Sequence, residues 1–266
     1  MKKRCRTLMV GMALVTGLTA LGGTPAGADE RGDEDEVALE ASLSGLNEVP
    51  TAGDADGTGE AEVEVKGTEV CWEIEVANIA TVTGAHIHVG AIGANGGVVV
   101  NFQGKLQGCT TVSPELATAL RNTPQSYYVN VHNAAFPGGA VRGQMRNKAH
   151  EAEEVEFKAR LSGAAERPGP GDPDGSGKFR AELEGTLLCW KFEEENVAPI
   201  TARHIHFAPA DRAGPVVVSF GAIARGCRDI TAPLAAAIVA NPAGYYVNSH
   251  NPAPAFPAGA VRGQLG

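Results

Sequence analysis

The sequence predicts an all-β protein made of two tandem antiparallel β-sandwich or barrel domains, each with one short helix and one disulfide. Three observations lead to this prediction. Short segments alternate between apolar and polar residues, as half-buried strands do. Glycine is abundant, with 34 residues among 266, which indicates many turns. The whole pattern occurs twice, and equivalent residues such as His86 and His204 are 118 positions apart.

The first 36 residues are not expected to belong to either domain. Four of the first six residues are basic, an apolar run follows from residue 8 to residue 21, and the small residues Ala26-Gly27-Ala28 come next. This order is typical of a secretory signal peptide, which we place at residues 1–28. Residues 29–36 read as an acidic, disordered leader. The protein is therefore expected to be secreted and extracellular.

The charge of the mature chain restricts its partners. The signal peptide contains four of the 22 basic residues and none of the 31 acidic ones, so the remainder carries a net charge near −13. Such a charge argues against nucleic acid and anionic membranes as partners. No later stretch is long and apolar enough to span a bilayer.

The repeats set the domain boundaries. Several motifs of the first half recur in the second half, and these are LSG, Cys-Trp, His-Ile-His, Tyr-Tyr-Val-Asn and GAVRGQ. A repeat of more than a hundred residues is a domain rather than a solenoid unit. We assign the domains to residues 37–147 and 155–266, joined by a charged linker at 148–154.

The strands of the first domain follow from alternation. Apolar residues alternate with other residues over 37–43, and valines alternate with glutamates over 60–65. Further strands are expected at 72–76, 85–89, 98–102, 127–132 and 140–145. Many short strands separated by turns predict an antiparallel sandwich or barrel.

One short helix interrupts the strands in each domain. Ser113 is suited to be the N-cap, with Pro114 at the first helical position. The equivalent helix is expected to begin near Thr231 and to stop before Pro242.

Four cysteines remain after removal of the signal peptide, in a compartment that permits disulfides. They allow three pairings. Cys71 and Cys109 are separated by 38 residues, and so are Cys189 and Cys227. The equal spacing favours one disulfide within each domain.

The motifs together resemble the CHRD domain, which is named for chordin. The resemblance rests on LSGLNEVP, AHIHVGAIGANGGVVV, YYVNVHN and GAVRGQ, and it covers both repeats. It implies an extracellular β domain without an established biochemical activity. The second copy departs from the first where Arg167 replaces Val49, Ala208 replaces Gly90 and Asp211 replaces Gly93, which places its turn geometry in question.

Six of the seven histidines form two equivalent trios, His86, His88, His132 and His204, His206, His250. Residues two apart on a strand share a face, so each His-x-His pair points one way. If the third histidine lies nearby, three imidazoles suit copper or zinc, with ring nitrogens within about 4 Å of one another. The alternative is that the histidines form hydrogen bonds within a polar layer.

Other polar residues also recur. Arg142 and Arg262 either bind an anion or orient a ligand near the histidines, or have a structural role, as a buried salt bridge or as a cap on carbonyl groups at a strand end. The structural role is preferred. Asn130 and Asn248 are expected to satisfy backbone groups. In each Tyr-Tyr pair, one ring is expected in the core and the other at the rim.

The function predicted first is an extracellular binding module that contacts an unidentified protein or matrix component. The alternative is a copper- or zinc-binding protein with one three-histidine site in each domain. A copper-dependent redox enzyme is a third interpretation. No nucleophile with an adjacent base stands out, so catalysis is not predicted.

Overall fold

The computed structural model describes residues 36–148, 154–197, 199–253 and 255–266. The predicted signal peptide, most of the acidic leader and residues 149–153 of the linker lie outside these ranges. Glu36, assigned above to the leader, is the first residue of a strand, and so is Glu154 of the predicted linker. No helix in these ranges is long and apolar enough to cross a membrane.

The first domain is mostly strand. Its strands are β1 (Glu36–Ser44), β2 (Thr58–Lys66), β3 (Glu69–Ala77), β4 (Val82–Val89), β5 (Val98–Asn101), β6 (Gln107–Thr111), β7 (Tyr127–Asn133), β8 (Val141–Gln144) and β9 (Arg146–Asn147). A helix, α1 (Pro114–Asn122), lies between β6 and β7, and short 3-10 turns follow β1 (η1, Gly45–Asn47) and α1 (η2, Pro124–Ser126).

The second domain repeats this order. Its strands are β10 (Glu154–Ser162), β11 (Ser176–Glu184), β12 (Leu187–Glu195), β13 (Ala202–Phe207), β14 (Val216–Gly221), β15 (Arg225–Asp229), β16 (Tyr245–His250) and β17 (Val261–Gln264). Its helix is α2 (Ala232–Ala240), and its 3-10 turns are η3 (Gly163–Ala165) and η4 (Pro242–Gly244).

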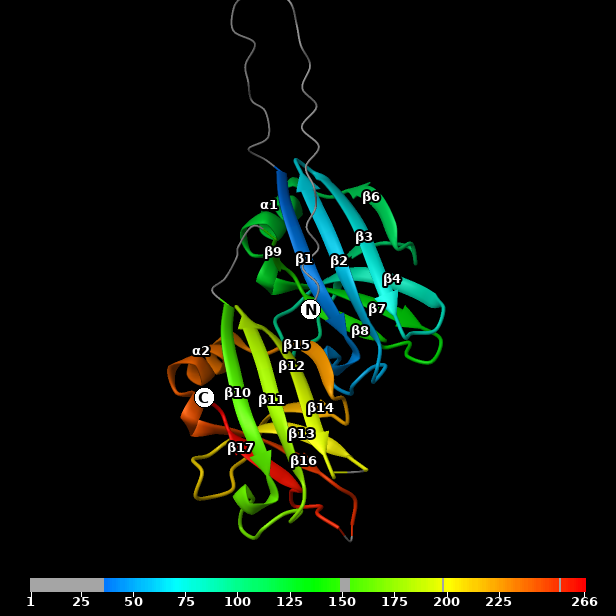
Figure 1. The fold of residues 1–266 in the computed structure, drawn as a ribbon. Helices are drawn as coiled ribbons and strands as arrows, with labels where there is room; N and C mark the ends of the chain where they lie inside the picture. Colours follow the sequence, from blue (N-terminus) through cyan, green and yellow to red (C-terminus); the bar gives the residue numbers. More distant parts are fainter. Residues whose placement is uncertain (1–35, 149–153, 198, 254) are drawn as a thin grey trace, which may run out of the picture. The chain divides into compact units, whose positions relative to one another are not determined.

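Each domain contains one antiparallel sheet that is bent into a half-barrel. The strand order is β5-β4-β7-β8-β1-β2-β3-β6 in the first domain, with β9 paired to β1, and β14-β13-β16-β17-β10-β11-β12-β15 in the second. The two halves of the first sheet meet where Ser44 of β1 pairs with Arg142 of β8. In Figure 1, β1, β2 and β3 form a layer over β4, β7 and β8. The predicted fold class is confirmed.

The hydrophobic core of each domain lies between these two halves. Every second residue of β1 and β2 faces inward, so Leu39 and Val63 are almost fully buried. Ile87 of β4 and Val129 of β7 contribute from the opposite half and are also inaccessible. The residues between them face outward, and this second face of β4 and β7 carries the histidines.

The predicted helices and disulfides are confirmed. Ser113 caps α1, because its Oγ accepts a hydrogen bond of 3.2 Å from the backbone N–H of Leu116. Cys71 of β3 lies directly opposite Cys109 of β6 and is bonded to it. Cys189 and Cys227 form the equivalent bond in the second domain.

Some strands were not anticipated. β6 and its counterpart β15 lie at one edge of each sheet. Residues 107–111 alternate only between exposed and half-buried positions, so the segment lacks the buried apolar residues that reveal a strand in a sequence. β9 has only two residues and exists through its pairing with β1.

Candidate metal centre

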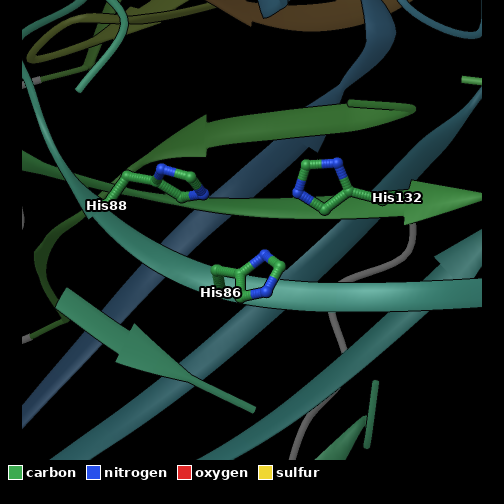
Figure 2. Close-up of side chains that lie close together, drawn as sticks. All are labelled: His86, His88 and His132. Carbon is green, nitrogen blue, oxygen red and sulfur yellow. The ribbon is translucent and has the colours of Figure 1, made fainter. Parts of the chain in front are cut away.

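Three histidines of the first domain meet on the outward face of two neighbouring strands. His86 and His88 alternate with core residues on β4 and therefore share a face. Residue 132 of the adjacent strand β7 lies opposite Gly84, two residues before His86, and faces the same way. Figure 2 shows the three imidazole rings gathered over these strands. Ring centroids are 5.1 Å apart for His86 and His132 and 5.5 Å apart for His86 and His88.

Hydrogen bonds to the backbone determine which ring nitrogen carries the hydrogen in two histidines of this trio. His88 Nδ1 lies 3.0 Å from the carbonyl oxygen of Gly96, and His132 Nδ1 lies 3.1 Å from that of Pro137. A carbonyl oxygen only accepts, so each Nδ1 carries the hydrogen and each Nε2 keeps a free lone pair. Both Nε2 atoms and His86 Nδ1 are buried without a hydrogen-bond partner.

Donor atoms from the three side chains lie within 4.8 Å of one another. This limit is somewhat wider than the spacing of about 4 Å expected around a bound ion. The structure therefore brings the predicted residues together, and binding of an ion remains a prediction.

The second domain holds the same arrangement. His204, His206 and His250 also offer donor atoms within 4.8 Å of one another. His206 Nδ1 donates to the carbonyl oxygen of Gly214 over 2.9 Å, and His250 Nδ1 donates to that of Pro257 over 3.0 Å. His204 Nδ1 lies 3.1 Å from His250 Nε2, so one imidazole donates its hydrogen to another. A metal ion at this position would replace that hydrogen.

The environment favours the neutral form of His86 and His204. Burial lowers the pKa of His86, and the neighbouring His132 and His88 lower it further. Burial, together with His250 and His206, lowers the pKa of His204 to about 4. Neutral imidazole is the form that binds metals, so His86 and His204 do not have to lose a proton at neutral pH.

A tyrosine and an arginine support the trio. The Tyr128 ring stacks on His88, with ring centroids 4.9 Å apart, and the Arg142 guanidinium carbon lies 3.4 Å from the Tyr128 ring centroid. The expectation that one tyrosine of the pair lies in the core is confirmed for Tyr127, but Tyr128 does not lie at the rim. Tyr128 is 1% exposed, because His88 and Arg142 pack against its ring. Tyr246 makes the same contacts in the second domain, with His206 and Arg262.

The recurring arginines cap carbonyl groups, as preferred from the sequence. Arg142 is 2% exposed, and its Nη2 donates to the carbonyl oxygens of Ala91 and Ala94 over 3.1 and 2.7 Å. It therefore holds the loop that contains Gly96, the hydrogen-bond acceptor of His88. Arg262 caps carbonyl groups in the equivalent loop.

A buried carboxyl group, Glu48, is hydrogen-bonded to Asn130, which lies opposite His86, and was not predicted from the sequence. Glu48 is 6% exposed, and its Oε2 accepts a hydrogen bond of 3.3 Å from Asn130 Nδ2. Asn130 was expected to satisfy backbone groups, but its amide donates to this carboxyl group instead. Glu166 is equally buried in the second domain. The available signal was the position of Glu48 within LSGLNEVP, since Glu166 follows 118 residues later.

Burial raises the pKa of Glu48 to about 7, against the lowering effects of Arg142 and Asn130. The native state therefore holds this proton more tightly than the unfolded chain does. Between about pH 4.5 and pH 7, rising pH lowers the free energy of unfolding. In Glu48→Gln we expect no such decrease in the free energy of unfolding. At pH 8 this variant should therefore be more stable than wild type by up to about 3 kcal/mol.

Denaturant unfolding of the metal-free protein at pH 5 and pH 8 measures this effect. Glu115→Gln is the control, because Glu115 lies on the surface of α1 and is fully exposed. If the change in the free energy of unfolding between pH 5 and pH 8 is the same in wild type and in Glu48→Gln, the Glu48 carboxyl group is ionised at both pH values.

The donor set indicates which ions the two sites suit. Each site presents three imidazole nitrogens on fixed ring orientations, and backbone carbonyls hold two of the three rings by their second nitrogen. Such outer hydrogen bonds set the tautomer and basicity of metal-binding histidines. Imidazole is a common ligand of copper and zinc.

The chain was compared with known proteins. The CHRD domain family model matches residues 39–145 and 157–265, which coincide with the two repeats and cover most of the chain. No curated protein and no solved structure gives a significant match. The chain therefore belongs to the CHRD domain family and contains two tandem copies of the domain.

Proposed function

We propose that this protein is an exported metal-binding protein that holds one copper or zinc ion in each CHRD domain. The observation that carries the proposal is the convergence, in both domains, of donor atoms from three histidines within 4.8 Å. In the first domain one ring nitrogen of each of the three histidines is buried and lacks a hydrogen-bond partner. Leaving such polar atoms unpaired is costly in free energy, and an ion would satisfy all three at once.

Copper is favoured over zinc. Affinity for nitrogen ligands among divalent first-row metals rises to copper and falls again at zinc. Three imidazoles leave at least one coordination position for water or another ligand.

The comparison of the two copies supports a role for the imidazoles themselves. The second copy has lost Gly90 and Gly93 of the nearby loop, which become Ala208 and Asp211. It has nevertheless kept the three histidines, both carbonyl acceptors and the stacked tyrosine. Loop geometry alone does not require these groups.

A second candidate is an extracellular binding module that contacts a protein or matrix component. Exposed apolar residues at equivalent positions of both domains favour it. Val89 and Val98 are 42% and 50% exposed, and their counterparts Phe207 and Val216 are 52% and 48% exposed. Val98 and Val216 belong to edge strands, which offer unpaired backbone groups to a partner.

Metal content tests the proposal directly. The purified mature protein is incubated with copper or with zinc and desalted, and the metal retained per chain is measured. We expect two ions per chain for wild type, one for His86→Ala or His204→Ala, and none for the double variant. A single variant loses one ion because the two sites share no ligand.

His150→Ala is the matched control, because this seventh histidine belongs to neither trio and should leave two ions bound. A wild-type protein that retains no metal would overturn the proposal and leave the binding module as the function. If the double variant retains as much metal as wild type, the metal is bound outside the two histidine trios.

A further inference from the structure

The outward face of β1, β2 and β3 carries rows of acidic residues. Glu40, Glu62 and Glu73 lie directly opposite one another on the three strands. Glu60 and Glu75 form the next row along the sheet. We call these five residues the acidic face. Like charges placed opposite each other on a sheet are unfavourable, so the fold itself gains nothing from this arrangement.

The central row of the equivalent face in the second domain has the opposite charge, although Glu156, Glu182 and Glu193 lie elsewhere on that face. Lys158, Arg180 and Lys191 stand where Glu40, Glu62 and Glu73 stand in the first domain, and they form the same row. The row is extended by Arg225 on β15. The next row contains Arg160 and Lys178, with Glu193 directly opposite Lys178. The basic face consists of Lys158, Arg160, Lys178, Arg180, Lys191 and Arg225.

Local partners neutralise each face only in part. In the acidic face, Arg146 pairs with Glu40 over 3.0 Å, and Lys148 pairs with Glu62 over 2.7 Å. Two of the cations in the basic face pair with glutamates on their own strands, Lys158 with Glu156 and Lys191 with Glu193. Among the described residues, three carboxylates of the acidic face and four cations of the basic face therefore have no ion pair.

The two faces also match in geometry. They are built on the same backbone frame, so their rows have the same strand spacing of about 4.8 Å. All six cations and four of the five carboxylates are exposed, and Glu40 is half-buried. One face laid on the other can therefore align rows of opposite charge at equal spacing.

We propose that the acidic face of one chain binds the basic face of a second copy of the same chain. Two acidic faces repel each other, and so do two basic faces, so the contact joins domain 1 of one molecule to domain 2 of the other. Two such contacts made reciprocally give a closed dimer, and contacts made in succession give an open chain. This inference is independent of the histidine sites.

Charge-reversal variants of the mature protein test the proposal by sedimentation. At about 0.01 M salt, where charges are screened over about 30 Å, wild type is expected to form dimers or longer chains. Both Glu62→Lys/Glu73→Lys and Arg180→Glu/Lys191→Glu are expected to be monomeric under the same conditions. An equimolar mixture of the two variants should associate again, because the unaltered basic face of the first variant can bind the unaltered acidic face of the second, and the two reversed central rows also have opposite charges.

Salt and a surface control complete the test. At about 1 M salt the screening length falls to about 3 Å, and association should weaken at least tenfold. Glu115→Lys on α1 changes charge away from both faces and should associate like wild type. Wild type that stays monomeric at low salt, or a mixture of folded variants that fails to associate, would overturn the proposal. Association that persists in both variants alone would do the same.

Discussion

Replacing Cys71 and Cys109 by alanine is expected to lower the free energy of unfolding of the first domain by about 4 kcal/mol. The disulfide closes a loop of 38 residues, and removing it restores conformational entropy to the unfolded chain. It also ties β6 to β3, and β6 is an edge strand paired on one side. Mesophilic domains are commonly stable by only about 5–15 kcal/mol, so this loss is a large fraction of the total.

The two tryptophans allow each domain to be followed separately. Trp72 neighbours Cys71 and is buried in the first domain, and Trp190 occupies the equivalent place in the second. Denaturant unfolding of Cys71→Ala/Cys109→Ala is measured by Trp72 fluorescence in a Trp190→Phe background. The second disulfide is removed in the same way, and unfolding is followed by Trp190 fluorescence in a Trp72→Phe background. The free energy of unfolding should fall by a similar amount, because Cys189 and Cys227 are also 38 residues apart. A loss below about 1 kcal/mol would contradict the loop-closure argument.

Replacing Arg142 by alanine is expected to cost about 3 kcal/mol of stability and to weaken metal binding in the first domain by about 10–100-fold. The guanidinium group satisfies the carbonyl oxygens of Ala91 and Ala94 and contacts the Tyr128 ring. Without it, these carbonyl acceptors lose their hydrogen-bond partner in the protein. The loop also carries the carbonyl of Gly96 that orients His88, so the effect reaches the metal site indirectly.

The effect on metal binding is measured in a His204→Ala background, in which the first site alone is intact. Arg142→Ala should raise the dissociation constant for copper there, and Arg142→Lys should be intermediate, because lysine cannot reproduce the forked contacts. Arg262→Ala is the matched control, because it caps the loop of the second domain and should leave the first site unchanged. An unchanged dissociation constant in Arg142→Ala would show that the loop does not position His88.

The elements that could be predicted from sequence are those with a local signature. Alternation located β1, β2 and β3, and the capping residue Ser113 located the start of α1. The equal spacing of the cysteines identified both disulfides. β6 and β15 lack buried apolar residues and were missed, because only their neighbours in the sheet make them strands.

The candidate site shows the same division. The two His-x-His pairs are visible in the chain, and their recurrence singled out the third histidine of each trio. The buried role of Glu48, its hydrogen bond with Asn130 and the stack of Tyr128 on His88 were not predicted. These contacts join residues 40 to 82 positions apart, and no pattern of neighbouring residues encodes them.

The sequence by itself determined the repeat, the strand-rich fold class, the disulfide pairing and the histidines that are candidates for a site, because spacing and alternation are properties of the chain. Only the tertiary structure decided that the histidines converge, that Glu48 is buried, and that rows of opposite charge occupy equivalent faces of the two domains. Those features depend on the register between strands that are distant in the chain. Register is set by how the core packs and how the backbone pairs, and therefore exists only in the folded protein.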